Sequence, residues 1–293
     1  MTVYTVGRYK VRVRFSPPDE NTYHQLLFRH SETILIGGQP DIDLKITQVP
    51  DWRESHRARR MFPMCFDKVT AHGVFVDHVV FKGELTNDAK KTTGVFHISA
   101  DGPAVVSILL QLCVAYRTLL DGGLMLHASG VAKNDRLYLF SGPSGYGKTT
   151  IAERLNDGGV PFTKEASCLF IDDALRVRAF STPFSDDKGT CVNVAPQSVH
   201  AISFIEQAVE HSVTPLSIGA AAMAMLANVR SFFTLPFLLE RLMATVASIS
   251  EGVPCAKLRF SKAPSFWGIL HEWADNDAKV GCNNEDDRHL RSA

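Results

Sequence analysis

The sequence lacks the cysteine and histidine patterns that mark metal-binding or disulfide-stabilised proteins. It contains no C-x-x-C pair, and no cluster of histidines accompanies a cysteine, so we expect no zinc site. The six cysteines lie far apart along the chain, a spacing that favours reduced and mostly buried thiols; they are Cys65, Cys113, Cys168, Cys191, Cys255 and Cys282.

An excess of charge and a long apolar run are also missing. Lysines and arginines number 31, as do aspartates and glutamates, so no overall field attracts the chain to nucleic acid or to an anionic membrane. The apolar stretch over residues 104–120 is interrupted by Gln111 and Arg117, which suits a buried amphipathic helix better than a membrane span. The first residues lack the charged and apolar regions of a signal peptide. We therefore expect a cytoplasmic protein with neither nucleic acid nor membrane as a partner.

One octapeptide, residues 142–149, carries a complete phosphate-binding pattern. It reads Gly-Pro-Ser-Gly-Tyr-Gly-Lys-Thr and matches G-x-x-x-x-G-K-[ST]. A short apolar run, residues 136–140, precedes it, and residues 149–155 follow with helical apolar spacing. The expected order of strand, loop and helix is the context in which this motif binds nucleotide phosphates.

The residue types of this loop explain the chemistry we expect. Its three glycines allow a tight turn in which backbone N–H groups point at an anion, and the start of the following helix adds partial positive charge. Lys148 is expected to contact the outer phosphates, and Thr149 to ligate Mg²⁺ through its hydroxyl. The residues predicted to bind the nucleotide are Gly142, Pro143, Ser144, Gly145, Tyr146, Gly147, Lys148, Thr149 and Thr150.

Around this motif the chain divides into three parts. Residues 1–120 show short alternating runs, such as 9–15 and 73–81, and predict a β-rich region that ends in a helix over about 102–120. Residues 121–274 hold the phosphate-binding loop and further helical and strand patterns. Residues 275–293 are polar and are expected to form a disordered tail. The predicted class is an α/β P-loop domain with an N-terminal β-rich region.

The segment from Leu126 to Leu155 resembles a known family. Gly-Leu-Met-Leu-His-Ala-Ser-Gly-Val-Ala, followed by a hairpin that turns at Asn134 and Asp135 and then by the loop, is similar to the C-terminal domain of HPr kinase/phosphorylase and its stand-alone relatives, the HPr-kinase-related serine kinases. The tetrapeptide Ser-Thr-Pro-Phe at residues 181–184 is a second matching block. The likeness covers about residues 120–270.

The resemblance implies both a fold and an activity. It implies the P-loop fold shared with phosphoenolpyruvate carboxykinase and Mg²⁺-dependent transfer of the γ-phosphate of ATP to a serine hydroxyl. It also implies that His127 lies close to the phosphates. From the residues alone, a structural, hydrogen-bonded histidine is the favoured interpretation of His127, and only the resemblance makes a role at the phosphates equally favoured.

The acidic residues required for this chemistry depart from the family pattern. Phosphoryl transfer needs a carboxylate near the phosphates, for the Mg²⁺ shell or for the hydroxyl proton. The family's acidic pair aligns with Lys164 and Glu165, so only Glu165 remains, as a candidate base and metal ligand. A lysine has the wrong charge for a metal shell, although it can neutralise phosphate.

A second alignment offers Asp172 and Asp173, which follow four apolar residues as in a Walker B strand. The same residues also suit the turn of a hairpin, and we favour the turn. Asp186 and Asp187 are a more remote option.

The sequence therefore predicts an ATP- and Mg²⁺-binding serine kinase with candidate catalytic residues His127, Glu165, Asp172 and Asp173. The acceptor is a serine-bearing protein or peptide, or a small hydroxyl compound, and a homo-oligomer is left open. The alternative is a nucleotide-binding regulatory protein without turnover, a pseudokinase, because Lys164 replaces an expected aspartate.

Overall fold

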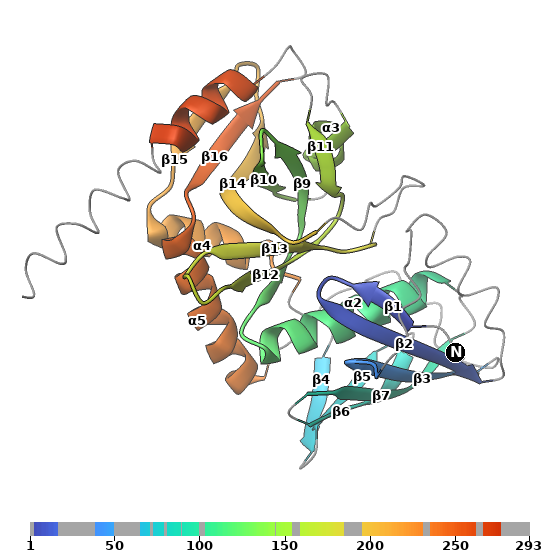
Figure 1. Cartoon of the computed structure of the whole chain (residues 1–293). Coiled ribbons are helices and arrows are strands. Elements are labelled where there is room, and N and C mark those ends of the chain that lie inside the picture. Colours follow the sequence, from blue (N-terminus) through green and yellow to red (C-terminus); the bar gives the residue numbers. More distant parts are fainter. Residues whose placement is uncertain are drawn as a thin grey trace, which may run out of the picture.

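The structure is a computed structural model that describes most of the chain. The described residues are 3–16, 39–49, 65–70, 73–78, 81–88, 90–99, 103–143, 145–153, 159–184, 195–230, 235–261 and 266–276. Helices and strands mix in a chain with two sheets, so the fold is α/β as predicted (Figure 1). No helix in these ranges is long and apolar enough to cross a membrane.

The N-terminal region forms a seven-stranded sheet in the order β1-β2-β3-β7-β6-β5-β4. Alternation of buried and half-exposed side chains along β2 explains why one face of this sheet packs inward. Its strands are β1 (Val3–Val6), β2 (Tyr9–Ser16), β3 (Ile42–Val49), β4 (Cys65–Thr70), β5 (Gly73–His78), β6 (Phe81–Asn87) and β7 (Thr92–Ser99).

Residues 73–81, expected to form one strand, instead belong to two. β5 and β6 pair antiparallel, and His78 is opposite Phe81, so the chain reverses between them. The apolar residues on both sides of Asp77 and His78 continue the strand pattern, so the sequence does not reveal this reversal.

Helix α2 (Pro103–Leu120) connects the two halves of the molecule, and most of its residues are apolar. In Figure 1 it runs between the seven-stranded sheet and the second sheet. Its side chains join one hydrophobic core with residues of both sheets, such as Leu44 of β3 and Leu139. Arg117, which interrupts the apolar run, is buried but paired with Asp121 at 2.9 Å.

The second sheet has nine strands. Strands β10, β14 and β16 are parallel neighbours, and β11 and β9 extend the sheet beyond β10. The strands are β8 (Leu124–Leu126), β9 (Ala128–Lys133), β10 (Arg136–Ser141), β11 (Val160–Thr163), β12 (Ser167–Ile171), β13 (Val177–Ser181), β14 (Gln197–Gln207), β15 (Ser212–Pro215) and β16 (Cys255–Phe260).

The hairpin predicted ahead of the loop is present as β9 and β10. Asn134 and Asp135 both have positive φ, at 52° and 59°, which the two-residue turn of a right-twisted hairpin requires. The segment ahead of this turn, residues 124–133, forms two strands that are divided at His127. β8 pairs with β12 whereas β9 pairs with β10 and β11, so His127 lies where the chain passes from one part of the sheet to another.

Among the described residues, four helices pack on the second sheet: α3 (Lys148–Glu153), α4 (Ile218–Leu226), α5 (Pro236–Gly252) and a helix over residues 267–276. Ile151 of α3 and Trp267 belong to a second hydrophobic cluster, separate from the main core. Asp275 belongs to the last helix and pairs with Arg136, so residues 275 and 276 are not part of a tail. Residues 277–293 lie outside the described part of the chain.

Candidate active site

The loop over residues 142–149, which carries the phosphate-binding sequence pattern, lies at the carboxyl end of β10, directly before α3. The parallel strands β14 and β16 end beside it: Gln207 at the end of β14 donates a hydrogen bond from Nε2 to the carbonyl oxygen of Gly145, at 3.3 Å. Ligands of open α/β sheets bind at this edge, outside the carboxyl ends of the strands. The loop therefore has the position that its sequence predicts.

Two glycines of the loop adopt backbone conformations that other residues rarely adopt. Gly145 has φ of 82° and Gly147 has φ of 101°. A Cβ atom on Gly147 would also lie 2.6 Å from Cζ of Phe260, the last residue of β16. Gly147 is thus required both by its backbone angle and by the close approach of an aromatic ring.

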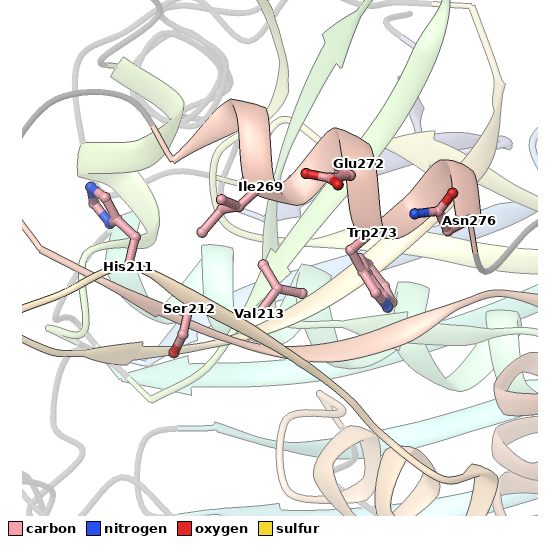
Figure 2. A pocket seen from close by; sticks show the side chains of 7 residues that line it. All are labelled: His211, Ser212, Val213, Ile269, Glu272, Trp273 and Asn276. Carbon is pink, nitrogen blue, oxygen red and sulfur yellow. The ribbon is translucent and has the colours of Figure 1, made fainter.

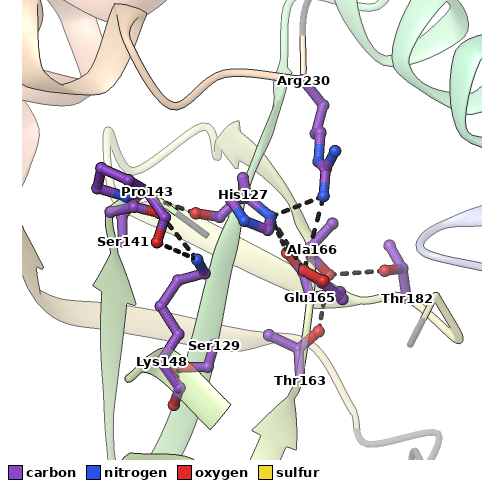
Figure 3. Close-up of polar contacts among 11 residues, drawn as sticks. His127, Ser129, Ser141, Pro143, Lys148, Thr163, Glu165, Ala166, Thr182 and Arg230 are labelled. Carbon is purple, nitrogen blue, oxygen red and sulfur yellow. Dashed lines mark hydrogen bonds and ion pairs between the residues drawn. The ribbon is translucent and has the colours of Figure 1, made fainter. Parts of the chain in front are cut away.

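Lys148 is buried at the start of α3, and its ammonium group turns back onto the loop. Nζ donates hydrogen bonds to the carbonyl oxygens of Gly142 at 2.8 Å and Pro143 at 3.0 Å (Figure 3). Burial lowers the pKa of Lys148; the negative charge of Glu165 opposes this shift and the positive charge of Arg230 adds to it. The lysine is held at the loop next to two further charged side chains.

The remaining residues predicted to bind the nucleotide differ in solvent exposure. Pro143 and Tyr146 lie at the surface, and Thr150 is partly buried. Ser144 lies outside the described residues, as does the side chain of Thr149, the predicted metal ligand.

His127 lies on the path between β8 and β9, next to the loop. Its carbonyl oxygen accepts a hydrogen bond from Oγ of Ser141, the last residue of β10, at 2.8 Å. Its ring nitrogen Nδ1 is 2.9 Å from the carbonyl oxygen of Glu165 and 2.9 Å from Nη2 of Arg230. Nδ1 donates to the first when it is protonated and accepts from the second when it is not.

Glu165 is in the turn between β11 and β12, and its side chain faces His127 and Arg230 (Figure 3). Oε2 is 3.1 Å from Nδ1 of His127 and 3.6 Å from Nη2 of Arg230, yet it accepts no well-aligned hydrogen bond from the described residues. Burial acts to raise the pKa of Glu165, but contact with His127 and the charges of His127, Arg230 and Lys148 together lower it. The carboxylate is therefore ionised at neutral pH.

Arg230 was not predicted from the sequence. It follows α4, and its backbone N–H donates to the carbonyl oxygen of Met125 at 2.8 Å, which brings it beside β8. Nε of Arg230 is buried and has no hydrogen-bond acceptor among the described residues. Nothing in the local sequence around Arg230 indicates that it lies beside His127 and Glu165. Its position depends on contact between the segment after α4 and β8, which are far apart in the sequence.

The structure does not bring Asp172 and Asp173 to this site. They form the turn of the β12–β13 hairpin, where the carboxylate of Asp172 accepts hydrogen bonds from the backbone N–H groups of Ala174 and Arg176. Asp172 lies five residues beyond Ser167, roughly 16 Å along the strand at about 3.3 Å per residue. The favoured interpretation of this pair as a turn is confirmed, and Asp186 and Asp187 lie outside the described residues.

The residues of this site are compatible with Mg²⁺. Magnesium in nucleotide sites takes one or two protein carboxylates and completes its shell with phosphate oxygens and water. Glu165 offers a half-buried carboxylate as an oxygen ligand, and a Mg²⁺ ion there would share Oε2 with His127 and Arg230, which lie 3.1 and 3.6 Å from it. No group of three or more acidic, histidine or cysteine side chains in the described ranges is arranged to hold a metal without phosphate.

A separate groove of about 370 Å³ lies between β15 and the helix over residues 267–276 (Figure 2). It has no lining residue in common with the phosphate-binding loop or with the His127, Glu165 and Arg230 group. The lining residues are His211, Ser212, Val213, Ile269, Glu272, Trp273 and Asn276.

Comparison with known proteins gives little support beyond this geometry. No family model matches the chain. No curated protein matches it. Among solved structures, the HPr(Ser) kinase/phosphatase from Coxiella burnetii aligns with 57% of this chain and 98% of its own, at 13% identity and a TM-score of 0.30. A likeness of this degree carries no argument about activity, which must rest on the residues of the site.

Proposed function

We propose that this protein binds ATP with Mg²⁺ and transfers the γ-phosphate to a serine or another hydroxyl group. The observation that carries the proposal is the meeting of Lys148, His127, Glu165 and Arg230 beside a complete phosphate-binding loop. These side chains come from four separate segments of the chain. These side chains converge on the loop, and the sequence resembles HPr-kinase-related serine kinases. Both observations favour phosphoryl transfer over a loop that is only a glycine-rich turn.

The balance of charge at the site suits a polyphosphate. Lys148 and Arg230 supply two fixed positive charges, and Lys164 is next to Glu165 in the same turn. Nε of Arg230 retains a donor for an anion. The loop amides and Lys148 would hold the phosphates, and Arg230 would stabilise the charge that develops on the transferred group. Bound magnesium would supply further neutralisation of the phosphate oxygens, with Glu165 and Thr149 as its protein ligands.

In the proposed step, the acceptor hydroxyl oxygen attacks the γ-phosphorus and the bond to the bridging oxygen of the diphosphate breaks. The hydroxyl proton passes to Glu165, which is ionised because its pKa is lowered. His127 contacts the backbone and side chain of Glu165 and helps to fix its position. Placing the reactants in line, rather than covalent chemistry by the protein, would supply most of the rate.

The alternative function is nucleotide binding without turnover. It is favoured by Lys164, which stands where the family carries an acid, and by the positive charges of Arg230 and Lys148 near Glu165. Such a protein would sense nucleotide rather than consume it.

A transfer assay distinguishes the two functions. The protein is incubated with Mg²⁺, ATP labelled at the γ-phosphate and a mixture of serine-containing peptides. Transfer is expected with the wild type, to be lost in Glu165→Gln, and to persist in Asp172→Asn, because Asp172 lies in a distant turn. Label that stays on ATP in the wild type, despite measurable nucleotide binding, would favour the regulatory alternative.

A further inference from the structure

The block Ser181–Phe184 has no role in the chemistry proposed above, although it is the second segment in which this chain resembles the kinase family. Thr182 directly follows β13 and is 1% exposed. Its hydroxyl donates a hydrogen bond to the carbonyl oxygen of Ala166, at 2.6 Å. Ala166 is the residue next to Glu165, so this bond fixes the backbone that carries the candidate base.

A second buried hydroxyl binds the same carbonyl oxygen. Thr163, at the end of β11 and also 1% exposed, donates from Oγ1 to Ala166 at 2.7 Å (Figure 3). A carbonyl oxygen has two lone pairs, and here both are used by threonine hydroxyls. The turn with Lys164 and Glu165 is therefore closed on one side by Thr163 and on the other by Thr182.

The backbone of Glu165 is held from the opposite direction as well. Its carbonyl oxygen accepts a hydrogen bond from the N–H of Ala128 at 3.1 Å, and Nδ1 of His127 is 2.9 Å away. The hydroxyl of Thr182 binds the backbone of Ala166 and not the carboxylate of Glu165, so any effect it has on Glu165 passes through the backbone.

We propose that Thr182, together with Thr163, is a positioning residue that sets where the carboxylate of Glu165 meets the phosphate site. The inference rests on the proposed function for what Glu165 does there. It explains the Thr-Pro-Phe block as a support for the turn that holds the base. A serine at position 182 can keep the hydrogen bond, whereas a valine cannot, and a buried carbonyl oxygen that loses a donor disfavours the original turn geometry.

The test compares ATP affinity by calorimetry in Mg²⁺ and in EDTA for the wild type, Thr182→Val and Thr182→Ser. Thr118→Val is the matched control, since its hydroxyl is equally buried and donates to the backbone carbonyl of Val114 at 2.7 Å inside α2, with a longer contact of 3.6 Å to Sγ of Cys168 and none to Ala166. We expect Thr182→Val to keep the affinity in EDTA and to reduce the strengthening by Mg²⁺ by about 10-fold, the usual effect of removing an outer hydrogen bond at a metal site. Thr182→Ser should restore it, and Thr118→Val should not change it.

A second measurement needs no nucleotide. Hydrogen exchange at the amide of Ala128, which donates to Glu165, should accelerate in Thr182→Val and not in Thr118→Val. Unchanged exchange, or an unchanged effect of Mg²⁺ in Thr182→Val, would overturn the positioning role. If the wild type shows no strengthening by Mg²⁺, the proposed function fails instead, and the exchange at Ala128 alone decides the role of Thr182.

Discussion

Gly147 shows how strongly a single loop position depends on the absence of a side chain. Its φ of 101° disfavours any other residue, and an added Cβ would meet the ring of Phe260 at 2.6 Å. We expect Gly147→Ala to lower the free energy of unfolding by about 1–3 kcal/mol, through backbone strain and overpacking, as measured by urea denaturation.

The control for this prediction is Gly219→Ala. Gly219 is in α4, and among the described residues nothing beyond its neighbours and its own helix backbone lies within 4 Å of an added Cβ there. Alanine in a helix is more stable than glycine by up to about 1 kcal/mol, so this variant should be unchanged or more stable. Equal destabilisation by both substitutions would contradict the role given to Phe260.

Arg230 is the residue of the site whose removal should most affect anion binding after Lys148. Replacement by methionine keeps much of the length and removes the charge that contacts His127 and Glu165. Because a hydrogen bond to a charged group contributes about 1.5–3 kcal/mol, we expect Arg230→Met to weaken ATP binding by about 10-fold or more in a fluorescence titration. Arg241→Met, which removes an exposed arginine that donates to the carbonyl oxygen of Leu120, should bind normally.

The sequence predicts the residues of this site unevenly, for a physical reason. Lys148 and the glycines belong to a short motif whose function depends on local backbone geometry, so they are recognisable from adjacent residues. The roles of Glu165 and His127 are predicted only through the resemblance to the kinase family. The structure places His127 next to Ser141 and Glu165 near Lys148. Arg230 depends on the pairing of the chain near Met125 with a segment after α4, which no local pattern records.

At the level of elements, local patterns predict helices α2 and α3 and the β9–β10 hairpin, but neither the helix over residues 267–276 nor the places where strands change partners. Residues 124–133 are mostly apolar and mostly buried in succession, and no proline or glycine stands next to His127, so nothing local marks the change there. The turn at Asp172 was identified because aspartates between two apolar runs satisfy their own backbone N–H groups. Which strands pair depends on residues far apart in the sequence, so the change of partners between β8 and β9 cannot be predicted from local patterns.

The helix over residues 267–276 is expected to bind the sheet in a pH-dependent way. Nδ1 of its His271 is 2.6 Å from the hydroxyl oxygen of Tyr138, and Nε2 of His200 on β14 is 3.4 Å from Oδ1 of Asp275. Burial lowers the pKa of both histidines; the positive charges of Arg136, near His200, and Lys133, near His271, add to the shift, and Asp275 opposes it.

The sign of the pH effect follows from these lowered pKa values. The undocked helix and strand would bind protons below about pH 6.5, the ordinary range of histidine, before the docked form does. Docking should therefore be fully stable above that pH and weaken as the pH falls further. Hydrogen exchange at the amide of Leu270 should accelerate between pH 7 and pH 5, and less so in a His200→Gln, His271→Gln double variant. Exchange that depends on pH to the same extent in both proteins, after correction for intrinsic rates, would contradict this account.

At the scale of the whole molecule, α2 makes the two sheets parts of one core. Leu112 of this helix is fully buried in the cluster that includes residues of both sheets. A leucine-to-alanine change in a core destabilises by about 2–5 kcal/mol, so we expect Leu112→Ala to lower the stability of β3 and β10 together. Hydrogen exchange in both strands with increasing denaturant measures this, and Leu175→Ala, at a side chain 78% exposed, is the control. Loss of protection in only one sheet would show that the halves unfold independently.

The most direct test of the central claim is calorimetry of ATP binding, with and without Mg²⁺, on the wild type and on Lys148→Ala. Lys148 is buried, and its Nζ donates hydrogen bonds to the carbonyl oxygens of Gly142 and Pro143. When a nucleotide binds, Nζ would exchange these acceptors for phosphate oxygens. The account predicts binding that Mg²⁺ strengthens and that Lys148→Ala abolishes while the protein remains folded. Absence of ATP binding by the wild type, or equal binding by Lys148→Ala, would contradict it.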